Sequence, residues 1–295
     1  MTKDDQPTST LPRRQLGRAL REAREGAGFT LERAAQLMEM GKASLGRIEK
    51  GQNDKVKLRD VEALGNLYGI SQEQIAELKA LAQQTATKMW WQALRHLLLP
   101  GYNTYLGLES GASDLYFYQP LIVPGLLQTK DYATAVEGPI RPTDTAADIE
   151  RRITLRLERS VILTRHHSPV RAEFILHENV LHTIVGSPRA MALQCRHIAD
   201  MSTRANVTVR ILPQAAGHPG QSVATPYIIL DFPLDSRGAT EPSVVYSETT
   251  IGRMFFEDND DMNQFRVIHE TLRCATLEEQ PSRNLLRDIA RRYDQ

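Results

Sequence analysis

The stretch Phe29–Gly51 decides the fold of the first third of the chain. It reads F-T-L-E-R-A-A-Q-L-M-E-M-G-K-A-S-L-G-R-I-E-K-G. Two short segments with the apolar spacing of helices are separated by a tight turn at residues 39–41, and Gly51 stops the second segment. This spacing predicts two helices that cross at a steep angle, with the second free to lie in a DNA major groove. The apolar residues expected to pack the two helices together are Leu31, Ala34, Ala35, Leu37, Leu45 and Ile48.

Further helices are expected on both sides of this pair. Residues 1–12 are polar and are predicted to form a disordered lead-in. Five segments with helical apolar spacing follow, and Thr30 suits the N-cap position of the second. The sequence therefore predicts an all-α helix-turn-helix domain over residues 13–84. Its five helices are expected to begin at or near Arg13, Thr30, Lys42, Leu58 and Ser71.

The rest of the chain has a different character. Residues 85–105, with Trp90 and Trp91, are too apolar for a solvated linker and are predicted to be an apolar helical connector. Residues 106–295 combine strand and helix composition, which predicts a mixed α/β domain. Its strands are expected at 170–176, 207–212, 227–232, 244–247 and 253–256, its helices at 144–164, 187–204, 260–275 and 282–293, and a long loop at 213–226.

The composition restricts the possible functions. A chain of 295 residues is long enough for two domains. Its 36 basic and 36 acidic residues cancel, which argues against a protein that coats DNA by charge alone. Residues 13–84 carry 13 Lys and Arg against 10 Asp and Glu, so a local basic face remains available for specific binding. Its non-specific affinity is expected to be modest and salt-dependent.

The cellular compartment follows from the cysteines and from the hydropathy. Two cysteines, Cys195 and Cys274, in a chain of this size favour a reducing compartment over a disulfide scaffold. No apolar stretch approaches the roughly 20 residues that cross a bilayer, and the start of the chain lacks the apolar core of a signal peptide. The sequence predicts a cytoplasmic protein without a membrane partner.

The candidate DNA-binding residues lie on and around the third predicted helix. Lys42 and Ser44 open this helix at the end nearest the base edges, with Ala43 between them, and Arg47 lies one turn further, within reach of a guanine edge or a phosphate. The alternative is that these side chains form a solvated face. Further candidates are Thr30 and Lys50 beside this surface and, as phosphate contacts that position the protein without specifying sequence, Arg13, Arg14, Arg18, Lys55 and Lys57, each of which could equally be ordinary surface charge.

Two other residues are expected to have a structural role. Arg24 and Glu49 stand where the first helix and the end of the third would meet, so a partly buried ion pair between them would fix the angle of the helix pair. Gly46 lies inside the third helix, where glycine costs roughly 1 kcal/mol relative to alanine. It would either permit a close approach of the backbone to DNA or leave this helix weak until DNA is bound.

No arrangement of residues indicates catalysis or metal binding. Cys195 and His197 are two residues apart on a predicted helix, so they point to different faces. His177 and His182 lack Cys or carboxylate ligands at metal spacing. The acidic run 257–261 lacks the glycine and the distal glutamate of a calcium loop and is better explained as a helix N-terminus. We therefore expect no enzyme, no metal and no cofactor.

The N-terminal part resembles the Xre/lambda-repressor-like DNA-binding domain. The likeness is carried by L-G-R-A-L-R-E-A-R-E-G-A-G-F-T-L-E-R-A-A (Leu16–Ala35) and A-S-L-G-R-I-E-K-G (Ala43–Gly51). In that family the residues matching Arg24 and Glu49 form an ion pair. This chain has Lys42 where glutamine is usual and Gly46 where serine is usual, so a base preference does not carry over.

The remainder resembles an uncharacterised domain that follows such modules in regulators of high-GC filamentous bacteria. The motifs are W-W at 90–91, Y-L-G-L-E-S-G-A-S at 105–113, V-P-G-L-L-Q-T-K-D-Y-A at 123–133 and N-V-T-V-R-I-L-P at 206–213. Some members are described as antitoxin-like, with a small partner protein encoded next door. The resemblance implies transcriptional regulation and supplies no ligand for the second domain.

Two functions follow from these observations. The first is a sequence-specific transcriptional regulator that binds a double-stranded DNA operator as a homodimer, with a C-terminal domain that dimerises, senses a signal or holds a partner. The alternative is an antitoxin-like interaction module that sequesters a small partner protein and autoregulates its operon. Residues 124–129 are the candidate for an exposed partner surface, unless they form a turn that buries Leu126 and Leu127.

Overall fold

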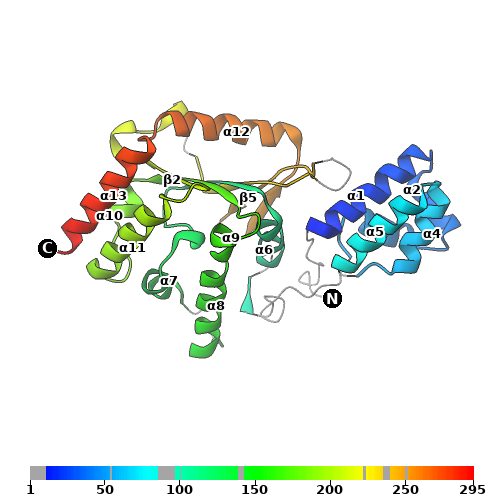
Figure 1. Ribbon diagram of the computed structural model, residues 1–295, viewed down its shortest axis with the longest axis horizontal. Coiled ribbons are helices and arrows are strands. Elements are labelled where there is room, and N and C mark those ends of the chain that lie inside the picture. The colour runs from blue at the N-terminus through cyan, green and yellow to red at the C-terminus, as the bar shows by residue number, and fades with distance from the viewer. Residues whose placement is uncertain are drawn as a thin grey trace. The chain divides into compact units, whose positions relative to one another are not determined.

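The chain forms two compact units in the computed structural model, which describes residues 11–53, 55–85, 97–99, 101–138, 143–221, 224–234, 240–249 and 252–295. The first unit comprises the described residues of 1–95, 99–111 and 234–241, and the second those of 96–98, 112–233 and 242–295. The predicted fold class is confirmed: an all-α N-terminal domain is followed by a mixed α/β domain (Figure 1).

The first unit is helical. Its first helix begins at Leu11, which is buried, so the lead-in predicted to extend to residue 12 is too long by two residues, and residues 1–10 lie outside the described part. The helices are α1 (Leu11–Gly26), α2 (Leu31–Leu37), α3 (Lys42–Glu49), α4 (Leu58–Tyr68), α5 (Gln72–Thr85) and α6 (Tyr102–Gly111).

Hydrogen-bonding side chains and a glycine cap these helices, and Thr30 is the N-cap of α2 as predicted. The Thr30 hydroxyl accepts a hydrogen bond from the Arg33 amide at 3.2 Å, which satisfies a free donor of the first turn of α2. Ser71 and Gln74 bond each other's backbone amides reciprocally at the start of α5. Gly69 ends α4 with a φ of 72°, a conformation that glycine adopts without a steric penalty.

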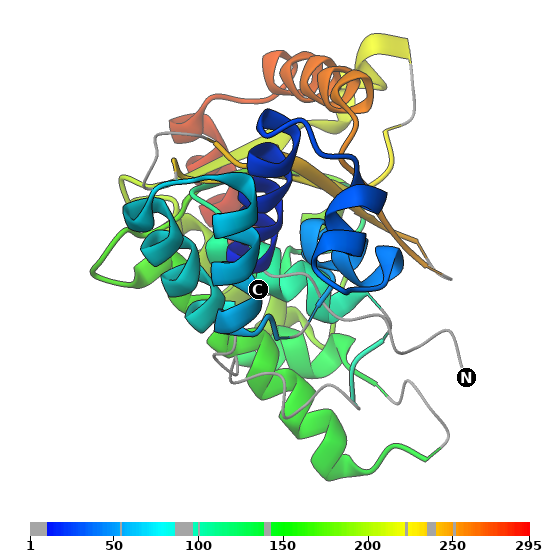
Figure 2. The ribbon, with the colours of Figure 1, turned by 90° about the vertical axis from the view of Figure 1, so that its right-hand side faces the viewer.

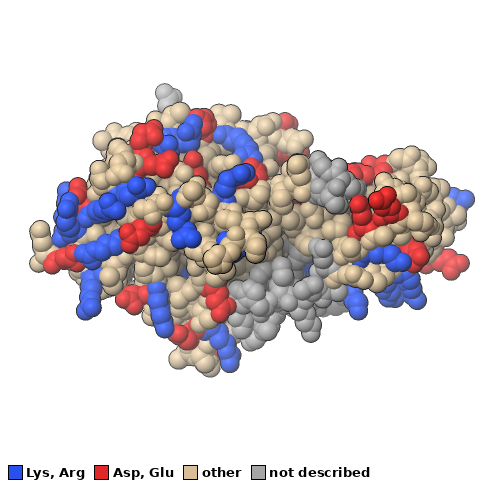
Figure 3. Space-filling view, viewed as in Figure 1, with Lys and Arg blue, Asp and Glu red and all other residues tan. Residues whose placement is uncertain are grey.

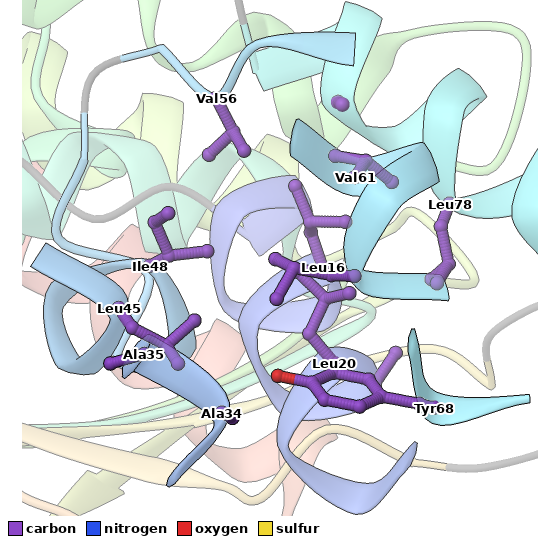
Figure 4. Close-up of a cluster of buried hydrophobic side chains, with 13 residues drawn as sticks. Leu16, Leu20, Ala34, Ala35, Leu45, Ile48, Val56, Val61, Tyr68 and Leu78 are labelled. Carbon is purple, nitrogen blue, oxygen red and sulfur yellow. The ribbon is translucent and has the colours of Figure 1, made fainter. Parts of the chain in front are cut away.

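A single apolar core holds α1 to α5 together. Leu16 and Leu20 of α1 lie at its centre, between the α2–α3 pair and α4 (Figure 4). Leu37, predicted to pack α2 against α3, is instead 44% exposed. The inward positions of α2 fall at 31, 34, 35 and 38, so Met38 packs against the core in its place.

The second unit is built on a six-stranded sheet with the order β3-β2-β1-β4-β5-β6. β1, β2 and β3 are parallel, and β4, β5 and β6 continue the sheet in antiparallel fashion. All five predicted strands are present, and β1 was missed. The strands are β1 (Asp114–Gln119), β2 (Arg171–His177), β3 (Val207–Leu212), β4 (Tyr227–Asp231), β5 (Val244–Glu248) and β6 (Arg253–Phe256).

Helices cover both faces of this sheet. Figures 1 and 2 show α12 (Asn259–Cys274) on one face and α8 (Ala146–Glu158) on the opposite side. The single helix predicted over 144–164 is two helices, α8 and the short α9 (Val161–Thr164). The other helices are α7 (Lys130–Val136), α10 (Asn179–His182), α11 (Pro188–Met201) and α13 (Glu279–Tyr293), with the 3-10 turns η2 (Gly125–Leu127), η3 (Gln214–Ala216) and η4 (Pro219–Gln221).

The predicted connector is only partly described. Residues 86–96, with both tryptophans, lie outside the described residues. Leu97 and Leu98 are buried, and α6 begins at Tyr102, within the range predicted for the connector. Among the described helices, none is both long and apolar enough to span a bilayer.

Candidate nucleic-acid interface

The α2–α3 pair is joined by a tight turn. Met40 donates its amide to the Ala35 carbonyl at 2.9 Å, and Glu39 adopts a φ of 52°, which is uncommon outside glycine. Gly41 is then the N-cap residue of α3. Leu45 and Ile48 are buried against the core, so the opposite face of α3 faces solvent.

The solvent face of α3 presents the predicted recognition residues together. Lys42, Ala43 and Arg47 are exposed, and Ser44 is half-buried between them. Arg47 donates to the Ser44 hydroxyl at 3.3 Å. Thr30 and Lys50 are also exposed, at the start of α2 and just after α3. This surface therefore combines cations with small and hydroxyl-bearing side chains, a set suited to phosphates and base edges.

Lys42 already has an acidic neighbour. Its ammonium forms an ion pair with Glu32 of α2, and the hydrogen bond from Lys42 lowers the pKa of that carboxyl. Both side chains are well exposed, so the pair is screened by solvent and can be exchanged for a phosphate at little cost.

A buried ion pair fixes α3 against α1. Arg24 donates to both carboxylate oxygens of Glu49, at 2.7 and 3.0 Å, and its third bond goes to the Phe29 carbonyl at 2.7 Å. The two side chains are 9% and 6% exposed. The hydrogen bond that Arg24 donates to Glu49 raises the pKa of Arg24 against the effect of burial. The structure thus places these two residues together, between α1, the start of α2 and the end of α3.

Close backbone contact also joins α1 to α3. A Cβ atom on Gly17 would lie 2.5 Å from the Ile48 carbonyl oxygen and 2.6 Å from that of Glu49. Gly46 is different, because a Cβ there would point towards α2 and meet Leu31 at an ordinary 3.5 Å. The missing side chain of Gly46 is therefore directed at α2, which does not favour a role in the approach of the backbone to DNA.

The cations of α1 are engaged within the protein. Arg13 is buried, at 4% exposed. Arg14 donates to Glu241 at 3.1 Å, and Arg18 contacts the other oxygen of the same carboxylate at 3.2 Å and the Thr240 carbonyl at 2.7 Å. Arg13 is buried, and Arg14 and Arg18 already bind an acid of the same compact unit. These three arginines are therefore poor candidates for phosphate contacts. Lys55 and Lys57 are exposed and remain candidates.

Sequence reasoning missed Glu241. It is 3% exposed and reaches α1 from a segment more than 220 residues downstream. No periodicity or motif links such distant positions. The only available signal was the pair of cations at i and i+4 on α1, which could attract either a phosphate or an acid.

The candidate partner surface at 124–129 is wrong. Leu126 and Leu127 are 1% and 0% exposed, because the 3-10 turn η2 directs both leucines inward. The buried Gln194 of α11 binds this turn, donating to the Leu127 carbonyl at 2.6 Å and accepting from the Thr129 amide at 2.8 Å. The segment is therefore a satisfied part of the interior.

Cys195 and the acidic run at 257–261 are placed for structural roles. The Cys195 thiol is fully buried, and burial raises its pKa to about 12, which keeps it protonated and unreactive. The acidic run at 257–261 forms the start of α12, as predicted, with the Asp258 carboxylate accepting from the Asp260 amide at 2.9 Å. On the face shown in Figure 3, basic and acidic side chains are interspersed over the second unit.

Comparison with known families agrees with this division of the chain. A helix-turn-helix domain family matches residues 15–78, and the family named domain of unknown function DUF5753 matches residues 102–288. No curated protein and no solved structure matches the chain. The α2–turn–α3 arrangement and this match define a helix-turn-helix protein, which indicates DNA binding. The second match spans more than half of the chain, which therefore belongs to the DUF5753 family.

Proposed function

We propose that this protein is a sequence-specific transcriptional regulator of the Xre/lambda-repressor type, in which α3 enters the major groove. The observation that carries the proposal is the solvent face of α3. It presents Lys42, Ala43 and Arg47 outward, while Leu45, Ile48 and the Arg24–Glu49 pair hold the opposite face. A rigid support of this kind fixes the position of the reading side chains before DNA is bound.

The protein is further proposed to bind as a homodimer in the cytoplasm. One short helix in one groove gives limited affinity, and two half-sites bound together restore it. The second unit would supply the dimer contact and the response to a signal or a protein partner. We propose no reaction for it, and the buried, protonated Cys195 fits a structural role.

A gel shift of the full chain against DNA from the region upstream of its own gene tests the proposal. The expected result is a specific complex that is lost in a Lys42→Ala, Arg47→Ala double variant. Arg47→Ala alone should weaken binding by about 1–3 kcal/mol, roughly 5- to 150-fold, if Arg47 makes a bidentate base contact.

The matched control is an Arg21→Ala, Lys79→Ala variant, which also removes two cations from the first unit but outside α3. Its complex should remain. Equal losses in the two double variants would mean that binding depends on total charge and would refute the proposed role of α3. Failure of the wild-type protein to bind, together with stoichiometric co-purification of a small protein encoded next door, would favour the antitoxin-like alternative.

A further inference from the structure

The two edges of the sheet in the second unit differ. At the β3 edge, the Leu277 amide donates to the Ile211 carbonyl at 2.8 Å, and the Ser282 hydroxyl accepts from the Ile211 amide at 3.0 Å. α13 and the segment before it therefore cover this edge. Among the strands that the structure describes, β6 is the last at the other edge and pairs only with β5. Such an edge is a template for another strand.

The direction of the β6 backbone groups follows from the hairpin that joins β5 to β6. The Thr249 amide donates to the Gly252 carbonyl at 2.8 Å, which makes this a hydrogen-bonded pair. Bonded and non-bonded pairs alternate along antiparallel strands, so Tyr246 and Phe255 form a non-bonded pair. The N–H and C=O of Phe255 therefore point away from β5. Among the described residues, no backbone bond to another segment satisfies them.

We propose that the β6 edge binds the β6 edge of a second copy of this chain, antiparallel and centred on Phe255, so that two sheets continue into one. The choice of a second copy rests on the proposed function, which requires two DNA-binding units. The register follows from Phe255, whose N–H and C=O both point away from β5. With Phe255 opposite the partner's Phe255, each accepts the other's amide as a hydrogen-bonded pair.

The strand sequence R-M-F-F-E (253–257) is complementary to itself in this register. Arg253 lies opposite the partner's Glu257, and the acidic start of each α12 is placed beside the basic end of the other strand. Arg253 keeps its bond to the Tyr246 hydroxyl at 3.1 Å and its ion pair with Glu248. The charges therefore alternate across the joined strands, an arrangement that favours the antiparallel pairing.

Aromatic and apolar contacts extend in the same register. The rings of Tyr246 and Phe255 lie 5.3 Å apart on one face of the sheet, and two-fold symmetry would continue this row through both copies of Phe255. On the other face, Met254 is 44% exposed and would lie opposite the partner's Phe256. Pairing would thus cover an apolar side chain that water now reaches.

Sedimentation of the full chain, wild type and Met254→Glu, tests the pairing. The wild type should be a dimer, and the variant should dissociate at least about tenfold more readily, because a carboxylate would face the partner's Phe256. Val267→Glu is the matched control, since Val267 is 67% exposed on α12 and lies outside the proposed contact. A monomeric wild type, or a Met254→Glu variant as dimeric as the wild type, would overturn the proposal.

A disulfide experiment tests the register independently. In a Cys274→Ser background, Phe255→Cys should form a reducible dimer on mild oxidation, because paired Cα atoms about 5.5 Å apart lie within disulfide range. Val267→Cys should not. A dimeric wild type without this cross-link would refute the Phe255-centred register. The proposed function fails separately, if a dimer with intact α3 binds no specific DNA.

Discussion

Glu49 illustrates how much a single buried charge can determine. Its carboxylate is nearly inaccessible to water, and it tolerates burial because Arg24 satisfies both oxygens. Removing one ion of such a pair leaves the other buried without compensation, which costs more than the pair itself contributes. The position of α3 relative to α1 therefore depends on this carboxylate.

We predict that Glu49→Ala lowers the free energy of unfolding by about 3–5 kcal/mol. Urea denaturation of the full chain, followed by far-ultraviolet circular dichroism, measures the loss. Glu25→Ala is the control, because Glu25 also contacts Arg24, at 3.3 Å, but is half exposed, so its removal should cost far less than the removal of Glu49. Equal effects in the two variants would show that the Arg24–Glu49 pair has no special role in stability.

Because the Tyr68 phenol is buried, we expect the first unit to lose stability at alkaline pH. Burial, reinforced by the charge of Glu49, raises its pKa to about 12 from the ordinary 10. The protonated phenol is thus favoured in the folded state. Its contribution to stability is complete below pH 10 and is lost as the pH rises towards 12. Denaturation from pH 8 upwards should show the wild type losing stability more steeply than Tyr68→Phe. Parallel curves for the two proteins would contradict the shifted pKa.

Residue-level prediction from sequence succeeds where partners are held at fixed spacing by neighbouring helices. Arg24 and Glu49 are such a case, because the α1 and α3 periodicities bring them to one crossing. Glu241 is the opposite case, since its partner is set by the tertiary fold alone. The prediction that Leu37 is buried failed for a third reason. Helix α2 ends at Leu37, and Met38, just past its last residue, packs against the core in its place.

At the level of elements, composition indicated where most strands lie, but it did not reveal β1 or the break between α8 and α9. β3 and β6 have the predicted bounds, because β-branched and aromatic residues end abruptly there. β1 was missed because Leu115, Phe117 and Tyr118 are all buried, which breaks the alternation of a half-exposed strand. The break between α8 and α9 was also missed, since no glycine or proline marks it.

The contact between α1 and α3 depends on the absence of a side chain at Gly17. Gly17→Ala should destabilise the first unit by about 1–3 kcal/mol, because its Cβ would collide with backbone carbonyls that cannot rotate away. Gly26→Ala is the matched control at the end of the same helix. Nothing lies within 4 Å of its Cβ position, so it should stabilise by roughly 0.5–1 kcal/mol. Thermal melts of both variants check this, and a stable Gly17→Ala protein would show that α1 and α3 can separate freely.

At the scale of the whole molecule, the sequence predicted an all-α domain followed by a mixed α/β domain, and the structure has both. The first unit takes in α6 and the segment 234–241 as well as the N-terminal helices. A boundary drawn from composition follows the order of the chain, whereas a compact unit gathers the residues that lie close together in space. The solvent face of α3 was predictable because the helix lies within one continuous motif.

The ion pair between Arg14 and Glu241 has a consequence for how the protein is made. Its two partners are separated by 227 residues, so at roughly 5–20 residues per second a ribosome needs about 10–45 s to deliver the carboxylate after the arginine. Until then Arg14 lacks its Glu241 partner. A message cut short before codon 241 would therefore yield the surface of α3 together with Arg14 and Arg18 without the Glu241 carboxylate that they contact in the finished chain. Such a fragment would bind nucleic acid with less discrimination than the finished chain.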